Sequence, residues 1–101
     1  MHIHIINFNI TGINRSEYEA AAMELTSAFA EVPGLIRKHW LANEENNTYG
    51  GVYIFDSKES HDAFTESELY AGVKGNPSFT NFSGKSFENI TKLAKHTRGA
   101  E

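Results

Sequence analysis

Cysteine is absent from this 101-residue sequence, and proline occurs only twice. Without cysteine the chain can form no disulfide, no thiolate nucleophile and no cysteine-ligated zinc or iron-sulfur site. No apolar run is long enough to cross a bilayer, and the segment from Met1 to His4 lacks the basic region and apolar core of a signal peptide. We therefore expect a cytoplasmic protein with no membrane partner.

The chain also has little net charge and few clustered charges of one sign. The formal net charge is -4, and the basic residues form no cluster apart from Arg37-Lys38. Because a nucleic-acid binder needs a basic face, we expect no nucleic-acid partner. With 40% hydrophobic residues, the chain is predicted to form a single domain over residues 1–101, with one core and a C-terminal tail at 88–101.

Period-two patterns predict four strands. Residues 2–10 alternate loosely as a strand does, and residues 79–87 form a second such run, in which Gly84 suggests a bulge. Between them, residues 35–55 contain two β-rich runs joined by a short Asn-rich connector. That pattern predicts an antiparallel hairpin.

Helical periodicity predicts two helices. Apolar residues recur every three or four positions after Tyr18, and a capping box of Ser16 and Glu19 is expected to start this helix. Pro33-Gly34 ends it, and a second helix is expected from about 57 to 70. The order β-α-β-β-α-β is the ferredoxin-like α+β fold, with a four-stranded antiparallel sheet and both helices on one face.

The second hairpin strand carries apolar residues on both of its faces. Val52 and Ile54 lie on one face, while Tyr53 and Phe55 lie on the other. The two predicted helices cover only one face of the sheet, and a bare apolar face is adhesive in water. We therefore expect a homodimer in which two sheets pack face to face as a dimeric α+β barrel.

Candidate chemistry is concentrated in the first hairpin strand. Trp40 is expected to lie across the hairpin from Gly50-Gly51, where it can either line a pocket or fill the space that the glycines leave; both options stay open. Lys38 and His39 can favour a bound phenolate or oxyanion, because a buried lysine has a lowered pKa. Alternating charges on a half-exposed strand can equally be a solvated face.

The histidines are weak candidates for a metal site. His2 and His4 share a strand face and could act with His39, but no carboxylate pattern completes a ligand set. We therefore expect no metal ion. His61 and His96 are expected on the surface.

Several blocks of the chain together resemble the YdhR-like monooxygenase family. They are Pro33-Gly34-Leu35, Lys38, Trp40, Glu44-Glu45-Asn46 and Gly50-Gly51-Val52-Tyr53-Ile54-Phe55, with further likeness at Phe8-Asn9 and Phe87-Glu88. The resemblance covers most of the chain, and its specific part is the hairpin. It implies a homodimeric α+β barrel similar to the antibiotic-biosynthesis monooxygenases, which oxidise phenols to quinones with dioxygen and without a metal or flavin cofactor.

In such chemistry the substrate supplies the reactivity, since a deprotonated hydroquinone can reduce dioxygen. The protein binds it, favours its anion and excludes water. From the residues and the resemblance together we expect catalytic roles for Lys38, His39 and Trp40, and binding of a small aromatic substrate by Ile36, Gly51, Tyr53 and Phe55. The role of His39 is particular to this chain, because the relatives look apolar at that position. Two other functions stay open: a non-catalytic module that binds a small aromatic ligand, and a heme-linked protein that depends on His39.

Overall fold

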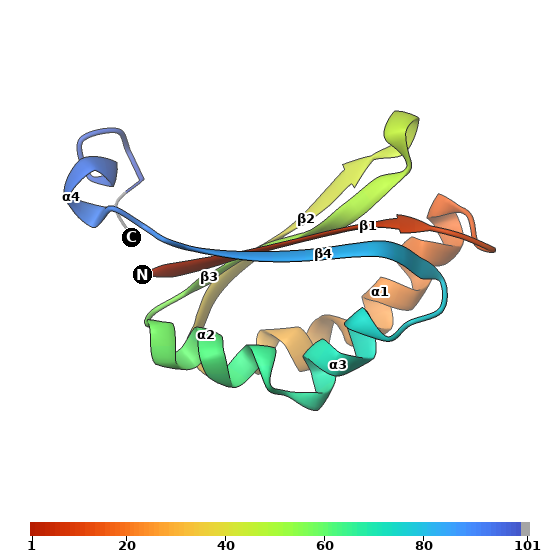
Figure 1. Ribbon diagram of the computed structural model, residues 1–101, viewed down its shortest axis with the longest axis horizontal. Coiled ribbons are helices and arrows are strands. Elements are labelled where there is room, and N and C mark those ends of the chain that lie inside the picture. The colour runs from red at the N-terminus through yellow and green to blue at the C-terminus, as the bar shows by residue number, and fades with distance from the viewer. Residues whose placement is uncertain (100–101) are drawn as a thin grey trace.

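The computed structural model describes residues 1–99 and confirms the ferredoxin-like α+β arrangement (Figure 1). The strands form one antiparallel sheet in the order β2-β3-β1-β4. Figure 1 shows α1, α2 and α3 on one face of this sheet and α4 beyond the end of β4. The elements are β1 (His2–Ile10), α1 (Arg15–Ala30), β2 (Leu35–Asn43), the 3-10 helix η1 (Glu44–Asn46), β3 (Thr48–Phe55), α2 (Lys58–Thr65), α3 (Glu68–Lys74), β4 (Phe79–Glu88) and α4 (Thr91–Ala94).

A capping box of Asn14 and Glu17 starts α1, so the prediction of Ser16 and Glu19 is wrong. The Asn14 side chain accepts a hydrogen bond from the Glu17 backbone N–H at 2.8 Å, and the Glu17 carboxylate accepts one from the Asn14 backbone N–H at 2.9 Å. Both pairs have the required spacing, and the sequence does not distinguish them. Glu19 instead forms a 2.8 Å ion pair with Arg15.

The predicted second helix is in fact two helices, and the predicted end at 70 is wrong. Ser67 causes the break. Its hydroxyl accepts a hydrogen bond from the Tyr70 backbone N–H at 3.2 Å and donates one to the Phe64 carbonyl at 2.6 Å. This serine therefore closes α2 and caps the start of α3, which continues to Lys74.

A bulge interrupts β4 at a place other than the predicted one. The pairing of β1 with β4 changes register around Asn81, whose φ is 55°. Gly84 stays in regular pairing, so the prediction of a bulge at this glycine is wrong. A Cβ at Gly84 would lie only 2.5 Å from the Tyr70 hydroxyl oxygen, so the glycine provides room for a side chain from α3.

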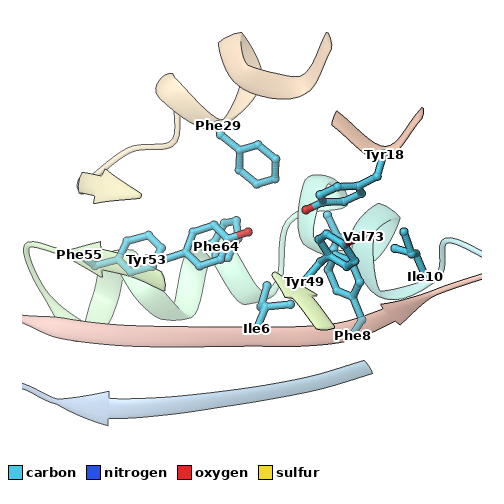
Figure 2. Close-up of a cluster of buried hydrophobic side chains, with 10 residues drawn as sticks. All are labelled: Ile6, Phe8, Ile10, Tyr18, Phe29, Tyr49, Tyr53, Phe55, Phe64 and Val73. Atoms are coloured by element: carbon cyan, nitrogen blue, oxygen red, sulfur yellow. The ribbon is translucent and has the colours of Figure 1, made fainter. Parts of the chain in front are cut away.

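The core lies between the sheet and the helices and is largely aromatic (Figure 2). Phe55 is 0% exposed, and Tyr49 and Tyr53 are each 2% exposed. In Figure 2 the Phe29 ring reaches down from α1 toward the rings on the sheet and α2. The cluster comprises Ile6, Phe8, Ile10, Tyr18, Phe29, Tyr49, Tyr53, Phe55, Phe64 and Val73.

The opposite face of the sheet carries the second apolar set that the alternation predicted. No helix of residues 1–99 covers this face in Figure 1. Strand register places Ile3, Ile5, Leu41, Val52, Ile54 and Phe87 on it. Among the helices of the same residues, none has the length and apolar character needed to cross a membrane.

Replacing Gly50 should test the close approach of β3 to β1. Gly50 has φ 152°, and an added Cβ would overlap the carbonyl oxygen of Ile6. We expect Gly50→Ala to lower the free energy of unfolding by about 3 kcal/mol in urea titrations. Gly72→Ala is the control, since nothing lies within 4 Å of its Cβ position, and it should be neutral or stabilising. Equal stabilities would contradict this packing.

Candidate functional site

The hairpin brings four of the predicted site residues to one place. Lys38 pairs with Tyr53 and Trp40 pairs with Gly51, as expected for Trp40. All four positions lie on the sheet face that packs against the helices, since Tyr53 belongs to the core. The site is therefore built on two adjacent strands beneath α1.

An aromatic cage surrounds the Lys38 amine. Its Nζ donates a hydrogen bond to the Tyr53 hydroxyl oxygen at 2.8 Å. The same atom lies 3.5 Å from the centroid of the Phe29 ring, 3.4 Å from that of Trp40 and 4.4 Å from that of Tyr53. Phe29 and Trp40 meet edge to face, with centroids 5.5 Å apart. Three rings and one hydroxyl thus hold a single cation in position.

Gly51 makes this arrangement possible. A Cβ at Gly51 would lie 3.2 Å from Lys38 Cε and 3.2 Å from Tyr53 Cε1. Any larger residue would press against both side chains. The sequence suggested that this glycine leaves space for a pocket. The aliphatic part of the Lys38 side chain occupies that space.

Burial controls the protonation of Lys38 and Tyr53. Desolvation lowers the pKa of Lys38 to about 7, so the amine exchanges between its charged and neutral forms near neutral pH. Desolvation also raises the pKa of Tyr53 far above its usual value, which keeps the hydroxyl protonated. The ring contacts favour the charged amine, whereas burial favours the neutral one. The site can therefore accept or hold a proton at Nζ.

Trp40, a residue that is 42% exposed, lines three cavities. The most enclosed has a volume of about 60 Å³ and runs under α1 to Phe29, Lys38 and Tyr53. A second, of about 330 Å³, opens beside Ile36 and also contains Lys38. A third, of about 250 Å³, extends toward Tyr18. Trp40 therefore borders the space rather than only filling it.

Two predicted site residues lie elsewhere. His39 alternates with Lys38 and Trp40 along β2, so it lies on the opposite face of the sheet. Phe55 is fully buried against Phe64, with ring centroids 5.4 Å apart, and lines none of the three cavities. Phe29 was missed, although its place on the apolar stripe of the first helix could have indicated that it faces the hairpin.

A buried histidine pair was also missed, and the prediction that His61 lies on the surface is wrong. His61 is 6% exposed and His4 is 4% exposed. The three-residue spacing from His61 to Phe64 on one helix face was the available signal. Within residues 1–99, no three histidine, aspartate or glutamate side chains are arranged to hold a metal ion.

The two histidines belong to a continuous hydrogen-bonded chain. Tyr70 Oη lies 3.1 Å from His4 Nε2, His4 Nδ1 lies 2.9 Å from His61 Nε2, and His61 Nδ1 lies 2.9 Å from Asp62 Oδ1. With neutral rings, every donor then points toward the Asp62 carboxylate, because the carboxylate can only accept. Burial and the neighbouring histidines lower the pKa of His4 to about 4.

The burial of His4 in this hydrogen-bonded chain predicts that the protein loses stability in mild acid. His4 has a pKa near 6.5 when unfolded and about 4 when folded, so the unfolded chain binds the extra proton between these pH values. The contribution is fully present above pH 6.5 and is lost as the pH falls toward 4, by about 3 kcal/mol. Urea titrations across this range should show the loss in wild type and in the exposed-site control His96→Gln. An equally steep loss in His4→Gln would contradict this assignment.

Comparison with protein families gives a match over nearly the whole sequence. The family model described as "Putative mono-oxygenase ydhR" matches residues 3–100. Comparison with curated proteins gives no match.

Solved structures share the fold at low sequence identity. The heme-degrader MhuD from Mycobacterium tuberculosis, with two hemes bound, is 21% identical with a TM-score of 0.68, covering 89% of this chain and 96% of that one. SnoaB, a cofactor-independent oxygenase from Streptomyces nogalater, is 16% identical with a TM-score of 0.66, covering 88% and 93%. The protein described as "Putative antibiotic biosynthesis monooxygenase from Nitrosomonas europaea" is 12% identical with a TM-score of 0.70, covering 89% and 99%. These likenesses establish the fold, and the family match establishes that the chain belongs to the ydhR mono-oxygenase family.

Proposed function

We propose that this protein is a cofactor-independent monooxygenase that oxidises a small phenolic or quinol compound with dioxygen, acting as a cytoplasmic homodimer. The observation that carries the proposal is the buried Lys38 amine. It faces two cavities, is held by aromatic rings, and has a pKa lowered to about 7. Such an amine can take the proton of a phenol and then stabilise the phenolate.

The neutral amine begins the reaction by accepting the phenol proton. The resulting ammonium and phenolate form an ion pair in apolar surroundings, where their attraction is stronger than in water. The phenolate passes one electron to dioxygen, giving a phenoxyl radical and superoxide. These combine at a ring carbon, and the peroxide anion takes the proton back from the Lys38 ammonium. Cleavage of the O–O bond, with loss of the hydrogen on that ring carbon, then releases water and leaves a quinone. One oxygen atom of dioxygen enters the quinone and the other leaves as water.

The surrounding side chains position the reactants and exclude water. The Tyr53 hydroxyl, 2.8 Å from Nζ, fixes the direction of the amine. Trp40 and Phe29 provide flat apolar walls suited to an aromatic ring, and Ile36 extends the wall of the larger cavity. Phe55 acts indirectly, because its ring stacks on Tyr53 with the planes 11° apart. His39 takes no part in this reaction, since it lies on the opposite face of the sheet.

A heme-linked function receives no support from the residues of this site. MhuD holds two hemes, which raises the question of whether this chain offers an axial ligand. None of the five histidines lines any of the three cavities around Trp40, and His39 lies on the other side of the sheet. The heme-linked alternative that depends on His39 therefore lacks its histidine in these cavities.

Replacing Lys38 should test the proposed reaction. We expect wild-type protein, freed of metal, to consume dioxygen with members of a hydroquinone and naphthol panel. Lys38→Met should lower kcat/KM by about 100-fold or more, because it removes both the base and the cation. The rate should rise with pH through about 7, as the amine becomes neutral. Oxygen-electrode measurements and product analysis provide the readout.

The control for this experiment is Lys74→Met, which removes an exposed lysine at the end of α3. It should retain wild-type oxygen uptake. Saturable binding of the same compounds without turnover by wild type would overturn the oxygenase proposal and support the alternative, a non-catalytic aromatic-ligand module.

The homodimer is tested separately by sedimentation. The apolar face of the sheet away from α1 supports a second copy as its cover. We expect a dimer at micromolar concentration, and Val52→Glu, on that face, should shift it to monomer. Met23→Glu is the control, since Met23 is 70% exposed on α1, and it should remain dimeric. A stable wild-type monomer would contradict the dimer.

A further inference from the structure

Lys38 differs from every other lysine of residues 1–99. The others, Lys58, Lys74, Lys85, Lys92 and Lys95, are exposed to solvent. Lys38 is only partly exposed and its Nζ lies among the rings of Phe29, Trp40 and Tyr53. Among the lysines of residues 1–99, Lys38 therefore combines a largely desolvated amine with a position in the lining of two cavities.

The cavities beside Lys38 contain no carboxylate. Neither the enclosed cavity of about 60 Å³ nor the larger one of about 330 Å³ has an aspartate or glutamate in its lining. The closest polar partner is the Tyr53 hydroxyl, 2.8 Å from Nζ. A lysine without a carboxylate partner, in an apolar cavity, is the environment in which an amine acts as a nucleophile.

From this geometry we propose that Lys38 captures small aromatic aldehydes or ketones as a covalent imine. The Nζ lone pair attacks the carbonyl carbon to form a carbinolamine, in which nitrogen loses a proton and oxygen gains one. Loss of water then forms the carbon-nitrogen double bond. The overall change is amine plus carbonyl to imine plus water, with no oxidation or reduction.

Tyr53 is placed to carry the proton in this reaction. Its hydroxyl is within hydrogen-bond distance of Nζ, and its raised pKa keeps it protonated. It can donate a proton to the developing alkoxide and receive one from nitrogen. The flat rings of Trp40 and Phe29 favour an aromatic carbonyl compound over an aliphatic one. The ligand class is therefore a single-ring aryl aldehyde or ketone.

Imine capture is independent of the oxygenase reaction, because it consumes no dioxygen. It uses the neutral form of the amine, and the lowered pKa of Lys38 makes that form abundant near neutral pH. An exposed lysine with an ordinary pKa of about 10.4 has only about one neutral amine in a few thousand at pH 7. A less basic amine is a weaker nucleophile, so each neutral Lys38 amine reacts more slowly than a neutral exposed lysine would. This effect is smaller than the gain from its larger neutral fraction.

The test is reductive trapping under nitrogen. The full-length protein is incubated at pH 7 with benzaldehyde and sodium cyanoborohydride, and labelled peptides are quantified by mass spectrometry. We expect Lys38 to be labelled at least tenfold faster than any of Lys58, Lys74 and Lys85. Acetaldehyde, which lacks a ring, should label Lys38 with a smaller excess over these exposed lysines.

Two variants keep the result interpretable. Tyr53→Phe retains the ring and should slow labelling of Lys38 several-fold while leaving the exposed lysines unchanged. In Lys38→Arg the rapid labelling assigned to position 38 should disappear, while labelling of the exposed lysines should stay unchanged. Circular dichroism should confirm that this variant is folded. Labelling of Lys38 no faster than that of the exposed lysines would overturn imine capture. Oxygen uptake is measured separately, so failure of either proposal leaves the other open to its own test.

Discussion

The site depends on holding a lysine amine among aromatic rings inside the fold. Removing a cation from water is costly, and this protein offsets part of that cost with the Tyr53 hydroxyl and the faces of Phe29 and Trp40. The offset is incomplete, which is why burial lowers the pKa of Lys38 to about 7. The neutral form of the amine is therefore available near neutral pH as a direct result of its incomplete solvation. A carboxylate beside the amine would instead raise the pKa of Lys38 and keep it charged.

Strand alternation made much of the site predictable. A period of two places Lys38 and Trp40 on one face, and hairpin pairing brings them opposite Tyr53 and Gly51. The same rule places His39 on the other face, so that candidate could have been separated from the others by sequence alone. The contribution of Phe29 was harder to predict, because it requires the helix α1 to pack at a particular height over the sheet.

The wrong predictions about the fold share one cause: local sequence patterns do not reveal which distant or competing contacts form. Two capping boxes with the same spacing compete at the start of α1, and only the surrounding chain selects Asn14 over Ser16. A single hydroxyl, that of Ser67, divides the second helical segment in two. The burial of His61 depends on His4, 57 positions away in the sequence. Local patterns identify the elements, whereas such contacts determine where they begin, end and pack.

Tyr53 connects the two polar networks of the protein. Its hydroxyl holds Lys38, while its ring packs against Phe64 at 5.0 Å and meets His4 edge to face at 6.4 Å. His4 in turn ties β1 to α2 and α3 through His61 and Tyr70. The histidine chain therefore supports the position of the tyrosine from the β1 side, whereas Lys38 lies on the β2 side. Because close-packed rings transmit small displacements, the packing of α2 on the sheet helps to set the direction in which the Lys38 amine points.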